Sequence, residues 1–144
     1  RVLFGEDVLQ GLQIDMHLHR VQVEYELREK LVLLRQHVLA AADSNSRLWD
    51  VLLHSVPSFA TLFRHALIAL GGNPAPSRAE AVQALAKQLQ FDPSAIQQAL
   101  DVRERKADPK KLDVKDVCAR YLAAIEKVAA AVDQALDSET HSHR

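Results

Sequence analysis

Apolar residues recur at intervals of three and four along most of this chain, the spacing of one face of an α-helix. Within residues 15 to 43 one apolar stripe comprises Val23, Leu27, Leu31, Leu34 and Val38. Further apolar residues are expected to widen this stripe: Leu18, Val21, Tyr25, Val32 and Leu39. Because an uncovered stripe would be a sticky patch, the segment is predicted to be a long helix that other helices cover.

A second helix is expected after the loop-forming sequence DSNS (43–46), with Ser46 as its N-cap, and should end near the glycine pair at 71–72. Its predicted core stripe comprises Leu48, Leu52, Val56, Phe59, Phe63, Leu67 and Leu70. Pro57 interrupts this stripe. Because proline lacks the backbone N–H and clashes with the carbonyl of Leu53, a kink or break is expected there.

Capping signals predict three more helices. Segment 77–90 begins with serine followed three residues later by glutamate, a capping box. Asp92 and Pro93 are expected to be the N-cap and first residue of a short fourth helix ending near residue 102. Asp113 caps a fifth helix, whose apolar spacing continues to about residue 137.

Three long and two short helices joined by short connections predict an all-α fold, an antiparallel bundle of about five helices. We expect residues 1–14 to be a strand end or linker forming the seam with an upstream domain. Residues 15–137 should form the bundle, and residues 138–144 a flexible tail. A hydrophobic content of 48% is enough for a core of its own.

Charge and cysteine content limit the partners and the compartment. Lysine plus arginine number 18 and aspartate plus glutamate 19, so the net charge of −1 argues against broad nucleic-acid binding. The single cysteine, Cys118, lies on the predicted core stripe of the last helix and cannot form an internal disulfide. With neither a signal-peptide pattern nor a long uncharged apolar run, the sequence predicts a cytoplasmic chain that does not enter a membrane.

A line of polar residues follows one face of the second predicted helix: Arg47, His54, Ser58, Thr61 and His65. Their spacings of seven, four, three and four put them on the side opposite the apolar stripe. The simpler interpretation is a solvated face. The competing hypothesis is that this line borders a substrate or partner groove, shaped by a bend at Pro57.

Other motifs give no sign of a self-sufficient active site, so no catalytic residue is assigned. The histidine pairs at 17 and 19 and at 141 and 143 are two residues apart, and such rings on a helix diverge by roughly 200°, so no metal site is predicted. A G-x-S-x-G nucleophile elbow is absent from the sequence. The paired acidic residues are explained by helix caps and surface pairing.

Arg47 and His54 resemble the arginine, four to six residues, histidine motif of HEPN ribonucleases. In that family the pair cleaves RNA at a dimer cleft, where arginine steadies a phosphate and histidine moves a proton. Leu48 stands where that family usually has a polar residue after the arginine. The near-neutral charge also provides no surface that attracts RNA.

A second resemblance covers nearly the whole chain. It is carried by the segments RVLFGEDVLQGL, YELREKLVLLRQHVL, VPSFATLFRHALIALGG, FDPSAIQQALDVRE and KKLDVKDVCARYLAAIEKVAAAVD. Together they resemble the carboxyl-terminal part of bacterial proteins with a minimal nucleotidyltransferase domain. In such proteins an upstream α/β domain carries a glycine-serine turn and a D-x-D pair that hold magnesium and a nucleotide triphosphate. This sequence contains neither motif.

The resemblance implies a non-catalytic, HEPN-like helical module that positions a substrate or binds a partner within a nucleotidyltransferase-like protein. It implies no cofactor in this chain and an upstream nucleotidyltransferase domain as partner. A homo-oligomer is also expected, because exposed apolar faces on the long helices would drive pairing. Two alternatives stay open. One is a HEPN-type ribonuclease that uses Arg47 and His54 across a homodimer, and the other is a dimerising bundle that scaffolds another protein.

Overall fold

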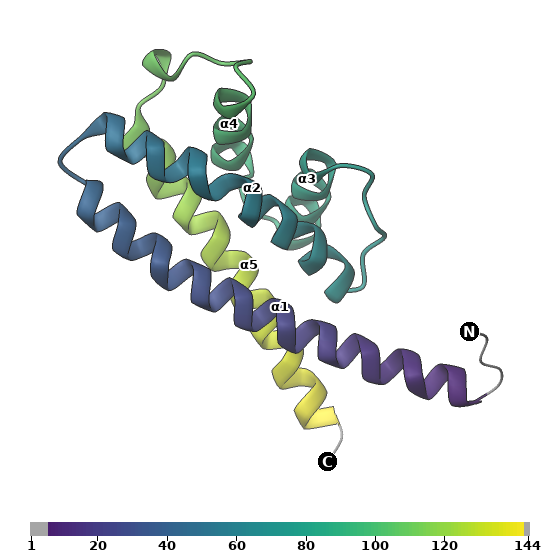
Figure 1. The fold of residues 1–144 in the computed structure, drawn as a ribbon. Coiled ribbons are helices and arrows are strands. Elements are labelled where there is room, and N and C mark those ends of the chain that lie inside the picture. Colours follow the sequence, from purple (N-terminus) through teal and green to yellow (C-terminus); the bar gives the residue numbers. More distant parts are fainter. Residues whose placement is uncertain (1–5, 143–144) are drawn as a thin grey trace.

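The computed structural model describes residues 6–142, with side chains described from 15 to 139. Its α-helices are α1 (Glu6–Ala41), α2 (Asn45–Ala69), α3 (Arg78–Leu89), α4 (Ser94–Arg103) and α5 (Val114–Ser142). A short 3₁₀ turn, Pro109–Lys111, precedes α5. Residues 6–142 contain no strand, so the predicted all-α bundle with three long and two short helices is confirmed (Figure 1).

The helix α2 occupies the centre of the bundle and contacts each of the other four α-helices. The long helices α1 and α5 pack against it and against each other, while α3 and α4 lie on the other side of α2 from α1 (Figure 1). By length and composition alone α2 could span a membrane, but the core helix of a soluble protein passes the same test. Ten residues of α2 are buried among the other helices.

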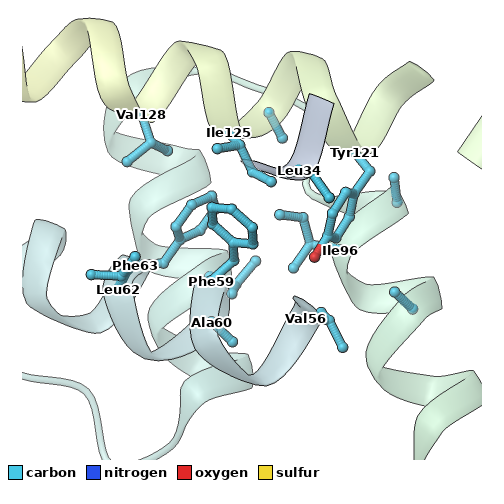
Figure 2. Close-up of a cluster of buried hydrophobic side chains, with 14 of the residues drawn as sticks. Leu34, Val56, Phe59, Ala60, Leu62, Phe63, Ile96, Tyr121, Ile125 and Val128 are labelled. Atoms are coloured by element: carbon cyan, nitrogen blue, oxygen red, sulfur yellow. The ribbon is translucent and has the colours of Figure 1, made fainter. Parts of the chain in front are cut away.

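The middle of the core is aromatic (Figure 2). Phe59 of α2 and Tyr121 of α5 pack edge to face, with ring centroids 6.2 Å apart. Tyr121 is fully buried, and its hydroxyl lies 2.8 Å from Ser55 Oγ, so its polar atom has a partner inside the core. This burial raises the pKa of Tyr121. The tyrosine therefore provides apolar packing without leaving an unpaired buried hydroxyl.

One apolar stripe of α1 faces the core, but the widening predicted for it is wrong. Val23, Leu27, Leu31 and Leu34 are buried and Val38 is half-buried, as expected. In contrast, the outer stripe of α1 is exposed, and we define it as Leu18, Val21, Tyr25, Val32 and Leu39. The last four of these each precede a buried residue by two positions. Because two positions turn a helix by roughly 200°, a residue and its buried successor face nearly opposite directions.

Both ends of the chain are more helical than expected. The helix α1 begins at Glu6 rather than near residue 15, so residues 6–14 belong to a helix, while residues 1–5 lie outside the described part. At the other end α5 continues to Ser142, into the segment expected to be a flexible tail. Glu139 explains this extension, because its carboxylate binds two side chains of α1, His17 and Arg20.

The helix caps are of the predicted kind, but two of them lie at a different residue from the one predicted. Ser77 accepts from the backbone N–H of Glu80 at 3.2 Å, and Asp113 from that of Lys115 at 3.1 Å. Ser44, rather than Ser46, caps α2. The N-cap position of α4 falls on Pro93, one residue after the predicted one, although the Asp92 carboxylate still accepts from the backbone of the first turn.

The break expected at Pro57 is absent, because α2 is continuous from 45 to 69. Proline leaves the Leu53 carbonyl without its usual helical donor. Arg103, the last residue of α4, donates from Nη1 to this oxygen at 2.7 Å. Arg78, the first residue of α3, donates from Nη1 to the Pro57 carbonyl at 3.3 Å. Two neighbouring helices thus provide donors to α2 around its proline.

The Arg103 contact leads to a measurable prediction. Arg103→Met should lower the free energy of unfolding by about 1 kcal/mol, because the Leu53 carbonyl loses its charged donor. In a Pro57→Ala background the loss should be smaller, since alanine restores a backbone N–H for Leu53. Urea denaturation of the four proteins measures this coupling, with Arg64→Met on the exposed side of α2 as control. Equal losses in both backgrounds would contradict the assignment.

Candidate interaction surface

The structure places the predicted polar line on the exposed side of α2, but divides it into three parts. Ser58, Thr61 and His65 line an open depression of about 360 Å³ together with Lys30 and Arg78. These three predicted groove residues are therefore brought together.

His54 lies in a separate open depression of about 540 Å³, with Asp50, Ser55 and Arg103. Arg47 lines neither depression. Its guanidinium donates to the Ala40 carbonyl at 2.9 Å and pairs with Asp43 at 3.3 Å, so it binds the end of α1. The five residues consequently do not border one groove, and Arg47 and His54 have different surroundings.

A histidine and arginine cluster joins the end of α2, the last turns of α5 and the part of α1 near residue 20. Arg20 donates from Nε to the Ala69 carbonyl at 2.7 Å and forms an ion pair with Glu139. His17 Nδ1 lies 2.7 Å from Glu139 Oε2. The rings of His19 and His65 meet edge to face, with centroids 5.7 Å apart. We name His17, His19, Arg20, His65 and Glu139 the junction cluster.

The surroundings in the junction cluster favour the neutral form of His19 and the ionised form of Glu139. Partial desolvation lowers the pKa of His19, and the nearby His65 and Arg20 lower it further. Burial acts to raise the pKa of Glu139, but hydrogen bonds from His17 and Arg20 outweigh it and lower the pKa overall. Sequence inspection missed Arg20 and Glu139, because no local pattern relates residues 119 positions apart.

The side chains between 15 and 139 contain no group of three or more histidine, cysteine or acidic residues arranged to hold a metal ion. His141 and His143 lie outside these described side chains. In the junction cluster the His19 ring contacts the His65 ring, and His17 forms a hydrogen bond with Glu139.

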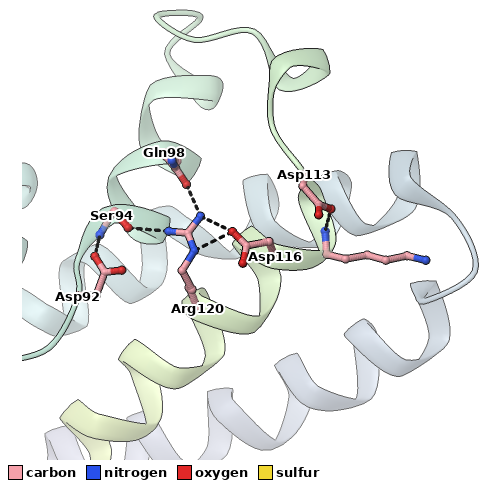
Figure 3. Close-up of polar contacts among 7 residues, drawn as sticks. Asp92, Ser94, Gln98, Asp113, Asp116 and Arg120 are labelled. Atoms are coloured by element: carbon pink, nitrogen blue, oxygen red, sulfur yellow. Dashed lines mark hydrogen bonds and ion pairs between the residues drawn. The ribbon is translucent and has the colours of Figure 1, made fainter.

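Arg120 of α5 forms another polar cluster, at the start of α4 (Figure 3). Its guanidinium donates to Asp116 at 2.9 Å, to Ser94 Oγ at 2.6 Å and to Gln98 Oε1 at 3.0 Å. The Ser94 backbone N–H donates to Asp92 at 2.9 Å, and this bond lowers the pKa of Asp92. Because each of the three guanidinium nitrogens has an acceptor within the chain, this cluster fixes α4 on α5.

The outer stripe of α1 is the most distinctive surface feature. Its five side chains are 42% to 77% exposed, although large apolar side chains gain by burial. They recur at intervals of three, four, seven and seven, and Arg28 and Arg35 occupy the positions that would complete a heptad pattern. Large apolar side chains gathered on one exposed helix face in this way often mark an interaction site.

Charged residues lie between and beside the apolar residues of the outer stripe. The Arg28 guanidinium lies 5.9 Å from the Tyr25 ring centroid and 3.6 Å from the Glu24 carboxylate. Arg35 lies 3.7 Å from Glu126 of α5. An open groove of about 490 Å³ runs between α1 and α5 along this edge, with alanines 129 and 130 on the α5 side. The outer stripe thus combines apolar residues with two arginines along its length, and acidic residues lie beside it.

Comparison with protein-family models, curated proteins and solved structures finds no match to this chain. The function must accordingly be argued from the surface itself.

The junction cluster predicts a pH-dependent stability. Because the folded state lowers the pKa of His19, stability should fall as pH drops below the ordinary histidine value of about 6.5. Glu139, whose pKa is also lowered, adds a further loss only in more acidic solution, below about pH 4.3.

Thermal unfolding between about pH 5 and pH 7.5 checks the histidine contribution. His19→Gln should flatten the dependence in this window, while His37→Gln, on an exposed part of α1, should keep the wild-type slope. An unchanged slope in His19→Gln would refute the prediction.

Proposed function

We propose that this chain is a non-catalytic helical interaction module whose working surface is the outer stripe of α1. One observation carries the proposal: five large apolar side chains lie exposed on the face of α1 that points away from the core. Their intervals match those that a partner helix recognises. Covering them removes apolar surface from water, which is the main favourable term in protein association.

The arrangement of the polar residues supports the non-catalytic part of the proposal. His54 and the Ser58, Thr61 and His65 group lie in separate open depressions, and Arg47 is engaged with the end of α1. Catalysis by acid and base groups needs partners within hydrogen-bond reach of one reacting atom. The described side chains of the polar line do not converge on such a point.

The resemblance of the chain's segments to nucleotidyltransferase-domain proteins supports a narrower proposal. Here the bundle would serve a nucleotidyltransferase-like protein, either by positioning a substrate or by holding a partner. Magnesium and the nucleotide triphosphate would then bind a separate domain with the glycine-serine turn and D-x-D pair that this sequence lacks.

This narrower proposal predicts that the chain by itself does not bind a magnesium nucleotide. Titration of ATP with magnesium into the purified chain should release no saturable heat, because the sequence lacks the D-x-D pair that would clamp the metal. A saturable isotherm would count against it.

The interaction surface can be tested by photo-crosslinking in cells that make the protein. A benzophenone amino acid at Val32 should yield a defined cross-linked product, identified by mass spectrometry of both joined peptides. Tyr25→Glu in the same protein should remove the product, because a buried charge opposes association. The same probe at Gln83, on the exposed face of α3, is the control. If positions 32 and 83 give the same pattern, the outer stripe is not an interaction surface.

A further inference from the structure

We infer that the partner of the outer stripe is a second copy of this chain, with the two α1 helices antiparallel and a two-fold axis passing between residues 28 and 29. The inference rests on the proposed function, because it names the occupant of the same surface. It is carried by the spacing of the apolar residues and by the signs of the charges among them.

Four of the five apolar residues of the outer stripe are symmetrically placed, whereas Val21 falls at the level of Gln36 of the second copy. Leu18, Tyr25, Val32 and Leu39 are each seven positions apart, so the midpoint of the set falls between residues 28 and 29. A two-fold axis there brings Leu18 to the level of Leu39 of the second copy. It also brings Tyr25 to the level of Val32 of the second copy. Such self-complementarity is what a symmetric dimer interface requires.

The charges nearest the midpoint are self-complementary as well. Arg28 and Glu29 are adjacent and exposed, with the Arg28 side chain 60% accessible. The two-fold axis places Arg28 of each copy at the level of Glu29 of the other, which allows two ion pairs at the axis. Exposed pairs of this kind add little affinity, but they select the direction of pairing.

A parallel pair would meet repulsion at the same positions. Arg28 and Arg35 occupy the heptad positions on the seam, so each would face its own copy across a parallel interface. In the antiparallel arrangement Arg35 lies at the level of Gln22 of the second copy instead. Like charges brought together disfavour the wrong arrangement, and the two arginines therefore select the antiparallel one.

The size of the surface suits a reversible dimer. Leu18 and Leu39 are separated by about 32 Å along the helix axis, at the usual rise per residue. Val32, Arg28 and Arg35 also line the groove between α1 and α5, where small alanine side chains border the seam. A contact limited to one helix and this groove buries little surface area compared with a permanent dimer. The dimer should therefore dissociate when the protein is diluted.

Cysteine cross-linking tests the arrangement directly, in the full chain with Cys118→Ala to remove the native thiol. Tyr25→Cys and Val32→Cys proteins carrying different tags are mixed and oxidised mildly. The antiparallel pairing predicts a disulfide between the two different proteins and little from either alone. A predominant disulfide between two Val32→Cys chains would establish a parallel arrangement and overturn the inference.

Sedimentation velocity over a wide range of concentration tests self-association without cross-linking. Wild type should form a dimer, Val32→Glu should weaken it at least tenfold, and Gln83→Glu on α3 should leave it unchanged. Arg28→Glu and Glu29→Arg should each weaken the dimer several-fold, whereas the double exchange should restore it. Circular dichroism of every variant separates loss of pairing from loss of folding.

The two proposals fail in different ways. A chain that stays monomeric at every concentration, yet cross-links from Val32 to a different protein, overturns the self-pairing and leaves the interaction module standing. If the protein with both charge exchanges, Arg28→Glu and Glu29→Arg, dimerises no better than the single variants, the proposed register of the two α1 helices is overturned. Absence of any specific cross-link from Val32, with no self-association, overturns both.

Discussion

The buried face of α2 is the contact on which the rest of the bundle depends. The helices α1, α3, α4 and α5 all pack against α2. Phe59 and Phe63 fill the middle of this face, and Tyr121 of α5 lies across Phe59 with its hydroxyl bound to Ser55. Since burial of aromatic side chains dominates the energetics of a small core, the positions of the other helices follow from how they cover these rings (Figure 2).

Local patterns in the sequence predict much of this fold. The core stripe of α2 and the caps at Ser77 and Asp113 depend on neighbours within a few positions. The structure has them as expected, except that Leu70 is the C-cap of α2 and only partly buried. The Arg103 bond to Leu53 and the Arg20 bond to Glu139 join distant segments, so no spacing rule indicates them. These contacts explain why α2 is continuous at its proline and why α5 continues past residue 137.

The candidate surface shows a different limit of sequence analysis. Periodicity places apolar residues of α1 on a helix, but it does not say which of two apolar stripes faces the core. Leu27 and Tyr25 differ by two positions, and only the packing of α2 and α5 decides that the first is buried and the second exposed. Exposure of the polar line on α2 could be predicted, whereas its division between two depressions depends on Lys30, Arg78 and Arg103 from other helices.

The proline in α2 also links the folding of two helices. A continuous helix with an unbonded carbonyl at Leu53 is weakened at its centre, and the missing donor comes from Arg103 at the end of α4. If α4 detached, the middle of α2 would lose this bond together with the cover over its buried face. Local opening of α4 should therefore not remain local, because the same opening event would loosen the middle of α2 and expose amide protons of both helices to solvent.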